Sequence, residues 1–292
     1  MEYSSLNEAI CDLFGNDRKI VDMTPVAGGD INEAKAVTLN DGTIIFMKSN
    51  RLQEFPSFQA ESRGLQEICN TGAIRTPKVL GMGTDSDISF LLLEFVSGGQ
   101  KIRNYWETLA EELAAMHRAQ TDGQIRYGFH EDNRIGSTRQ INTPHDTWIS
   151  FFRDCRLLPQ FQWAQAYFDA EDRKQIGYLL EHLDQYLVEA ERPALIHGDL
   201  WAGNVITGND GKAWLIDPAV YYGHPEADLA MTELFGGFSY TFYAVYREAG
   251  GLEDGYQDRR DLYNLYHLLN HLNLFGRSYL SSVKRIIKHY AG

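Results

Sequence analysis

The segment from Leu195 to Asp217, which reads LIHGDLWAGNVITGNDGKAWLID, constrains this chain more than any other part of it. It sets Asp199, Asn204 and Asp217 between short apolar runs, with Asn204 five positions and Asp217 18 positions after Asp199. Apolar runs broken by Gly-Asn-Asp-Gly predict paired strands around a turn. We therefore expect the two carboxylates and the amide to come together at the ends of strands.

Oxygen-bearing side chains at this spacing predict a site for a divalent cation. Mg²⁺ prefers oxygen ligands and usually binds together with the phosphates of a substrate. An Asp, an Asn five residues later and a second Asp further on form the pattern of phosphotransferase catalytic loops. Each residue taken alone fits an ordinary turn equally well. The combination of His197-Gly-Asp199, Asn204 and Ile216-Asp217 argues against turns alone.

The composition is that of a globular protein with one large domain or two lobes. The 292 residues are 43% hydrophobic and 12% aromatic, which is enough to build a sizeable core. The formal net charge of −13 argues against a nucleic-acid partner, because binding to phosphates needs clustered Lys and Arg. The same charge is compatible with a cationic substrate.

The sequence does not have the features of a membrane or secreted protein. Its longest apolar run, Phe90–Phe95, is far too short to span a bilayer and contains Glu94. The first residues, MEYSSLNEAI, lack the basic and then apolar pattern of a signal peptide. The three cysteines fit neither a disulfide framework nor a metal site. We expect a cytoplasmic protein with no membrane partner, monomeric, with a dimer left open.

Hydrophobic periodicity divides the chain into a small α+β lobe, residues 1–96, and a larger and mainly helical lobe, residues 97–292. The turn Ser97-Gly98-Gly99 marks the boundary. In the first lobe we expect helices at 4–15 and 56–70 and strands at 20–27, 33–39, 43–48, 79–83 and 88–96. In the second lobe we expect helices at 104–119, 145–156, 170–191, 227–235, 239–250 and 257–288.

Lys48 and Glu61 are a candidate ion pair in the first lobe. Lys48 ends the strand 43–48, on the face that also carries apolar residues. Glu61 falls on the apolar stripe of the next helix, three residues after Phe58 and four before Leu65. A carboxylate directed at a core is costly unless a cation meets it, and Lys48 is the nearest candidate. Such a pair directs a lysine to nucleotide phosphates, whereas the alternative is that both side chains reach solvent.

Two further segments are candidates for nucleotide contacts. Gly28, Gly29 and Asp30 lie between two predicted strands, where glycines let backbone N–H groups approach a phosphate. An ordinary hairpin turn would have the same sequence. The buried run that ends in Glu94-Phe95-Val96 leads into the lobe boundary, where backbone amides could bind adenine. A strand with a purely structural role would have the same sequence pattern. His117 lies on an apolar helix face and is predicted to be a core histidine rather than a catalyst.

On these residues the chain resembles the fructosamine kinase (ketosamine kinase) family, within the wider group of aminoglycoside- and choline-kinase-like phosphotransferases. His197-Gly-Asp199 with Asn204 and Asp217 indicates the wider group, and Trp201 in HGDLWAGN indicates the narrower family. Three further segments match the family, so the resemblance runs across most of the chain: DPAVYYGHPEADLAM (217–231), WISFFRDCRLLPQ (148–160) and LAAMHR (113–118). It implies a bilobal, protein-kinase-like fold with an antiparallel sheet and a helix in the small lobe.

The resemblance also implies roles for the residues of the catalytic segment. Asp199 would be the catalytic base toward a sugar hydroxyl of a ketosamine, the product of a sugar and an amine. Asn204 and Asp217 would hold Mg²⁺, and Trp201 would help to shape the sugar pocket. The implied activity is ATP- and Mg²⁺-dependent phosphorylation of fructosamine, ribulosamine or erythrulosamine adducts, a deglycation-type repair.

Nucleotide-binding roles carry over in the same way. Lys48 would contact the α- and β-phosphates and Glu61 would hold Lys48 in place. The remaining ATP contacts are implied for the glycine turn over the phosphates and for the lobe boundary at adenine: Gly28, Gly29, Asp30, Glu94, Phe95 and Val96. Many relatives have a cysteine in the glycine turn, whereas this chain has Asp30, so disulfide-based control through that turn is not expected.

Other functions are compatible with the same residues. A kinase of this fold could act on an aminoglycoside, on choline or on another small alcohol. A nucleotide-binding protein without catalysis would not need the intact lysine, glutamate, base and metal ligands. A hydrolase with Asp199 and Asp217 as a carboxylate pair would leave Asn204, Lys48 and Glu61 without a role.

Overall fold

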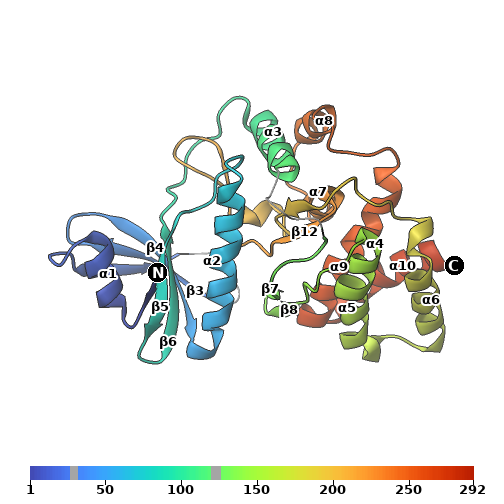
Figure 1. Cartoon of the computed structure of the whole chain (residues 1–292), viewed down its shortest axis with the longest axis horizontal. Helices are drawn as coiled ribbons and strands as arrows, with labels where there is room; N and C mark the ends of the chain where they lie inside the picture. The colour runs from blue at the N-terminus through green and yellow to red at the C-terminus, as the bar shows by residue number, and fades with distance from the viewer. Residues whose placement is uncertain (27–31, 120–125) are drawn as a thin grey trace. The chain divides into compact units, whose positions relative to one another are not determined.

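A mixed six-stranded sheet, with strand order β1-β5-β6-β4-β3-β2, is the framework of the N-terminal part of the computed structural model (Figure 1). The structure describes residues 1–26, 32–119 and 126–292. The strands are β1 (Glu2–Tyr3), β2 (Ile20–Pro25), β3 (Glu33–Leu39), β4 (Ile44–Arg51), β5 (Val79–Asp85) and β6 (Ile88–Glu94). Neighbouring strands are antiparallel, as predicted, except for β1, which pairs parallel with β5. A two-residue strand has no periodicity from which it could be predicted.

The residues of β6 pack against two helices, one on each face of the sheet. Alternate residues of a strand point to opposite faces. Phe90 and Leu92 join the core that α1 (Leu6–Phe14) covers, whereas Leu91 and Leu93 join the core under α2 (Phe55–Asn70). The two helices therefore cover opposite faces of the sheet, and each buried Leu or Phe side chain contributes about 1.5–3 kcal/mol to stability.

The chain forms two compact units: Met1–Tyr105 with Val205–Pro218, and Trp106–Asn204 with Ala219–Gly292. The hairpin of β10 (Val205–Thr207) and β11 (Ala213–Leu215) confirms the strands predicted around Gly-Asn-Asp-Gly. It belongs to the first unit because the Leu215 N–H donates to Arg75 O at 2.8 Å and the Gly99 N–H donates to Thr207 O at 3.1 Å. The predicted division into residues 1–96 and 97–292 placed this hairpin in the second lobe, whereas the structure groups it with the N-terminal unit.

The second unit is mainly helical, as predicted (Figure 1). Its helices are α3 (Tyr105–Arg118), α4 (Trp148–Phe151), a π-helix (Phe152–Leu157), α5 (Leu158–Trp163), α6 (Ala170–Glu181), α7 (Pro225–Leu234), α8 (Tyr240–Glu248), α9 (Tyr256–Phe275) and α10 (Leu280–Ala291). Two short strand pairs accompany them: β7 (Asn133–Ile135) with β8 (Thr138–Gln140), and β9 (Ala194–Ile196) with β12 (Tyr221–Gly223). The long helix α9 packs against α5, α7 and α10.

Three helix boundaries differ from the predicted ones. The helix predicted over 145–156 begins at Trp148, after Thr147 caps it, and continues through the π-helix. The helix predicted over 170–191 ends at Glu181. The helix predicted over 257–288 is divided at Gly276, whose φ of 86° lies in the left-handed region that glycine adopts without strain. No helix in the described ranges has both the length and the apolar character required to cross a bilayer.

Candidate active site

Lys48 lies at the centre of a charged cluster in the N-terminal unit. Its Nζ donates to Glu61 Oε1 at 2.7 Å and also to Asp217 Oδ1. The side chains of Lys48 and Glu61 are only 9% and 12% exposed. This confirms the ion pair that strand alternation and the helical stripe predicted. It also brings Asp217, 169 positions further along the chain, onto the same ammonium group.

The two carboxylates keep Lys48 charged. Burial alone would lower the pKa of Lys48, because a low-dielectric environment disfavours an ammonium ion. The negative charges of Glu61 and Asp217 outweigh burial and raise the pKa of Lys48 above its ordinary value. A lysine held as a cation on the strand β4 can bind the phosphates of a nucleotide.

Asp217 has a strained backbone, which is a frequent property of functional residues. Its φ of 54° lies in the left-handed region, where residues other than glycine are uncommon. The residue follows the strand β11, and its side chain is 40% exposed. The hairpin therefore presents a partly exposed carboxylate beside Lys48.

The catalytic segment of the second unit is anchored by Asp228 on α7. Asp228 accepts hydrogen bonds from the backbone N–H of His197 at 2.7 Å and from that of Gly198 at 2.8 Å. Gly198 has a φ of 81°, and a Cβ there would lie 2.1 Å from Ala219 O, so only glycine fits. These contacts fix the backbone immediately before Asp199.

Asp228 is supported in turn by two buried side chains. His117 Nε2–H donates to Asp228 Oδ2 at 3.1 Å, and the Tyr246 hydroxyl donates to His117 Nδ1 at 2.6 Å. Burial alone would raise the pKa of Asp228, but the hydrogen bonds from His117 and from the backbone N–H of His197 lower it below its ordinary value. His117 is thus a core histidine, as predicted, and it orients an ionised carboxylate. Asp228 was not among the predicted site residues, although a charged residue within the run Ala227–Met231 was a signal.

Asn204 holds both the backbone carbonyl and the side chain of Asp199. Its Nδ2 donates to the Asp199 carbonyl at 2.8 Å and to Asp199 Oδ2 at 3.1 Å. With the amide nitrogen engaged in this way, Oδ1 is the atom of Asn204 that can serve as a metal ligand. The loop between the two residues is tight, because the Asn204 N–H donates to Trp201 O at 2.9 Å.

Trp201 lies on this loop with its ring over Gly203. A Cβ at Gly203 would lie 2.2–2.5 Å from three atoms of the indole, so a side chain there would displace the ring. The indole is 39% exposed and makes an edge contact with Phe235, at 6.2 Å between ring centroids. One loop therefore carries Asp199, Asn204 and a partly exposed aromatic ring.

The donor set fits Mg²⁺ bound together with phosphates. Within the described residues, no three His, Cys, Asp or Glu side chains converge to hold a metal by themselves. Mg²⁺ usually keeps several waters and takes one or two protein oxygens plus substrate phosphates. The carboxylate of Asp217 and the amide oxygen of Asn204 are ligands of this kind. That both residues act on one ion stays a prediction.

The structure describes only one of the two other segments predicted to contact the nucleotide, the end of β6. Glu94 ends β6, where its N–H donates to Lys78 O at 2.8 Å and its side chain accepts from the Lys78 N–H at 3.2 Å. Its own N–H is thus used within the sheet, and Phe95 and Val96 follow the end of the strand. The glycine turn, Gly28 to Asp30, lies outside the described residues.

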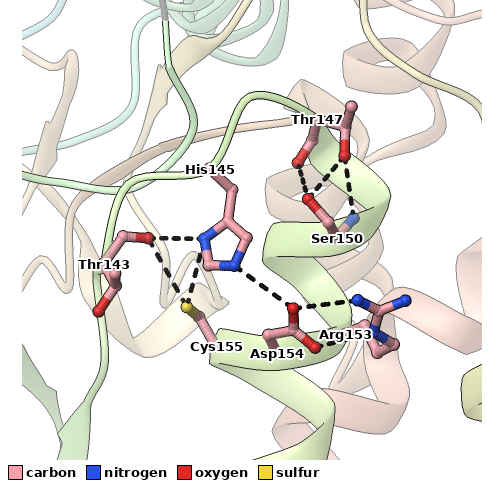
Figure 2. A network of polar contacts seen from close by, with 7 residues as sticks. All are labelled: Thr143, His145, Thr147, Ser150, Arg153, Asp154 and Cys155. Atoms are coloured by element: carbon pink, nitrogen blue, oxygen red, sulfur yellow. Dashed lines mark hydrogen bonds and ion pairs between the residues drawn. The ribbon is translucent and has the colours of Figure 1, made fainter.

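An aspartate and a cysteine of the π-helix lie near a histidine that precedes α4, but the three do not form a nucleophilic site (Figure 2). His145 Nδ1–H donates to Thr143 O at 2.8 Å, so this nitrogen cannot take a proton from Cys155, whose Sγ is 3.9 Å away. Burial raises the pKa of Cys155 to about 11, which keeps the thiol protonated. His145 Nε2 lies 3.4 Å from Asp154. All three cysteines of the chain are free thiols.

Replacement of Asp228 by Asn tests whether the anchor positions Asp199. An Asn can accept only one of the two backbone N–H bonds well, so we expect the free energy of unfolding to fall by about 1–3 kcal/mol. We expect kcat to fall by up to about 10²-fold, because a displaced base loses its alignment. Urea unfolding and steady-state kinetics measure the two effects. Tyr246→Phe removes only the hydrogen bond to His117, so it should lower stability and kcat less than Asp228→Asn does. An unchanged kcat in Asp228→Asn would contradict the positioning role of Asp228.

Comparison with known proteins identifies the family. The model of the fructosamine kinase family matches residues 3–291. A probable ketoamine kinase of Synechocystis sp. is 37% identical over 287 residues, which cover 98% of this chain and 96% of the relative. The chloroplastic protein-ribulosamine 3-kinase of Oryza sativa subsp. indica is 38% identical over 279 residues, 94% of this chain and 80% of the relative.

A solved structure supports the same family and fold. One named as a fructosamine-3-kinase of Haemophilus somnus superposes with a TM-score of 0.88 at 28% identity and covers 99% of this chain and 97% of that chain. The predicted α+β, bilobal, protein-kinase-like fold is confirmed. With the family model matching nearly every residue and the HGDLWAGN loop intact, this chain belongs to the fructosamine kinase family.

Proposed function

We propose that this chain transfers the γ-phosphoryl group of ATP to a sugar hydroxyl of a ketosamine, as a deglycation-type repair enzyme. The observation that carries the proposal is the loop of Asp199, whose backbone is anchored by Asp228 and whose carboxylate is held by Asn204, next to the exposed ring of Trp201. The names of the relatives, ketoamine kinase and protein-ribulosamine 3-kinase, support the substrate class.

In this reaction Asp199 takes the proton of the attacking hydroxyl. The hydroxyl oxygen then forms its bond to the γ-phosphorus, and ADP leaves with the electron pair of the broken bond. A positioned base of this kind typically contributes about 10²–10⁴-fold to the rate. The transition state of phosphoryl transfer is loose, so the fixed backbone around Asp199 contributes mainly by positioning.

The Lys48 cluster is proposed to hold the nucleotide. Lys48 binds the α- and β-phosphates, and Glu61 keeps its ammonium group in place. Asp217 and the Oδ1 of Asn204 are the proposed Mg²⁺ ligands, and the ion would neutralise charge on the phosphates. Adenine is proposed to lie at the segment after β6, which includes Phe95 and Val96, and the glycine turn is proposed to cover the phosphates. A cytoplasmic monomer stays a prediction.

The 3-hydroxyl is the proposed site of phosphorylation. The rice relative is named a ribulosamine 3-kinase, and the adducts of fructose, ribulose and erythrulose all have a hydroxyl at carbon 3. An ADP-release screen over these three adducts, with the free amines, an aminoglycoside and choline as controls, tests the substrate class. NMR of the product locates the phosphate. ADP release with the aminoglycoside or choline alone would overturn the proposal.

Replacement of Gly203 by Ala tests the role of the Trp201 ring without touching the base. The new Cβ displaces the indole, so we expect KM for the ketosamine to rise about tenfold, a loss of about 1.4 kcal/mol of binding. Affinity for Mg·ATP should stay within about twofold of the parent. Trp201→Phe, which keeps an aromatic ring and leaves Gly203 in place, should change KM less. Equal KM values for Gly203→Ala and the parent would remove Trp201 from the sugar pocket.

A further inference from the structure

Arg156 is a buried cation that the proposed chemistry does not use. It lies in the segment 148–160 that matches the family, and the residue is 0% exposed. Its guanidinium donates to Ile141 O at 2.6 Å, to Cys155 O at 3.0 Å and to Asn142 Oδ1 at 2.7 Å. In the ranges that the structure describes, no carboxylate forms an ion pair with it. A buried charge without a counter-ion is costly, so this one needs another source of stabilisation.

Three aromatic rings take the place of a carboxylate. The guanidinium carbon lies 3.8 Å from the ring centroid of Tyr221, 4.6 Å from that of Phe151 and 5.5 Å from that of Tyr266. The faces of such rings attract a cation, most strongly where water is excluded. Tyr221 begins β12 and pairs with Ile196 at the end of β9. Arg156 therefore stacks on the strand pair that leads into the catalytic loop.

The guanidinium sets the direction of a chain of amide side chains. Arginine can only donate, so Asn142 turns its Oδ1 to Arg156 and its Nδ2 away. That Nδ2 donates to Asn133 Oδ1 at 2.9 Å, and the Nδ2 of Asn133 then donates to Val220 O at 2.8 Å. The oxygen and nitrogen of an amide have nearly the same shape, so a neutral residue at position 156 would not fix this direction.

Gln140 joins the same chain. Its Nε2 donates to Asn133 Oδ1 at 2.7 Å and to Ala219 O at 2.9 Å. Its Oε1 accepts from the Tyr266 hydroxyl at 2.8 Å, and burial raises the pKa of Tyr266, which keeps this donor protonated. Asn133 and Gln140 are both buried and lie opposite each other in the pair of β7 and β8. The network thus ends on two successive backbone carbonyls, those of Ala219 and Val220.

The backbone at Ala219 is a second support of the catalytic loop. The Ala219 N–H donates to His197 O at 2.9 Å. The Ala219 carbonyl oxygen lies against Gly198, where a Cβ would be only 2.1 Å away. Asp228 binds the N–H of His197, whereas Ala219 binds its C=O. Both backbone polar groups of His197 are therefore held, and with them the path of the chain into Asp199.

We propose that Arg156 is a positioning residue for Asp199. It acts through three amide side chains that hold the carbonyls just before β12, those of Asn142, Asn133 and Gln140. The inference rests on the proposed function, in which Asp199 is the base, and adds a residue that acts on this base through the backbone. A base misplaced by about 1 Å can lose about 10²-fold in rate, so loss of the network should appear in kcat rather than in the affinity for either substrate.

Replacement of Asn133 by Leu removes the centre of the network at nearly constant volume. Val220 O loses its donor, and Gln140 and Asn142 lose their acceptor. We expect kcat to fall about tenfold, with KM for the ketosamine and affinity for Mg·ATP within about twofold of the parent. ADP release and calorimetry, at a temperature well below the melting point of each variant, measure these quantities. Amide hydrogen exchange over residues 195–200 should become about tenfold faster, and this readout does not depend on turnover.

Asn270→Leu is the matched control. Asn270 is also a buried amide of the second unit, 3% exposed, and its Oδ1 accepts a hydrogen bond from Gln160 Nε2 at 3.2 Å. It lies on α9, outside the network. The variant should melt at a lower temperature than the parent but keep kcat and the exchange rates over 195–200 within about twofold. Equal losses of kcat in Asn133→Leu and Asn270→Leu would show a general loss of packing and overturn the inference.

Two replacements test Arg156 itself. Lys keeps a cationic donor without the planar fork, whereas Met has a similar length and no donor. We expect Arg156→Lys to retain a kcat at least about threefold higher than that of Arg156→Met. Equal kcat values in the two variants would overturn the role of the cation. If Arg156→Met does not fold, the comparison of Asn133→Leu with Asn270→Leu decides the matter.

A double variant separates the inference from the proposed function. In an Asp199→Asn background no base remains to be positioned, so Asn133→Leu should change the residual turnover by less than about twofold. A further loss of about tenfold in that background would overturn action through Asp199. A parent that releases no ADP with any ketosamine overturns the proposed function. Equal exchange rates over 195–200 in Asn133→Leu and the parent overturn the hold of the network on the loop.

Discussion

Replacement of Asp199 by Asn should lower kcat by about 10²–10⁴-fold, the range that a positioned general base contributes. The Asn side chain cannot take the hydroxyl proton, yet it has the same shape and can keep a contact with Asn204. The backbone should stay anchored, because Asp228 binds the N–H groups of His197 and Gly198 and not the side chain of residue 199. We therefore expect Mg·ATP affinity to stay within a few-fold of the parent.

Coupled ADP release and calorimetry with Mg·ATP measure the two quantities for Asp199→Asn. Asp184→Asn, the same exchange at an exposed surface position, is the matched control and should behave as the parent. Turnover by Asp199→Asn within a few-fold of the parent would refute the assignment of the base. A loss of Mg·ATP binding as large as the loss of kcat would instead place Asp199 at the nucleotide.

Replacement of Asp217 by Ala should weaken Mg·ATP binding itself, by about 10²-fold or more. Asp217 is proposed to be a direct metal ligand, so its removal would lose a charge-assisted contact, and such contacts are worth several kcal/mol in a partly desolvated site. Loss of the ion pair with Lys48 has the opposite effect on the affinity for ATP without the metal. Without Asp217 the ammonium group of Lys48 keeps Glu61 as its carboxylate partner among the residues that the structure describes. Metal-free ATP should therefore bind as well as in the parent or more tightly.

Calorimetry with and without Mg²⁺ separates these two effects. For Asp217→Ala we expect a large loss with the metal and no loss in EDTA. Lys48→Met should lose affinity under both conditions, because the lysine is proposed to contact phosphates directly. Equal losses with and without metal in Asp217→Ala would show that its role is to hold Lys48, and not the ion.

The N-terminal half of the site was predictable because its signals are local and periodic. Strand alternation placed Lys48 on an apolar face, and the helical stripe placed Glu61 toward the same core. A buried charge needs a partner, so two short-range patterns were enough to predict a contact between two elements. The hairpin after Asn204 was predictable for a similar reason, since its turn residues and apolar runs lie next to one another in the sequence.

The supports of Asp199 were not predictable in this way. Asp228 follows Asp199 by 29 positions, and its partners His117 and Tyr246 come from α3 and α8. No periodicity connects these segments, and a buried Asp in a helix indicates only that some partner exists.

The sequence by itself predicted the chemistry: a base, oxygen donors, a lysine with its glutamate, and a tryptophan beside the base. Residue type and short spacing carry that information, because each side chain has a fixed set of donors, acceptors and charges. Only the tertiary structure decided which contacts hold Asp199 in place. Those contacts join segments far apart in the chain, and their formation depends on the packing of the whole second unit around α7 and α9.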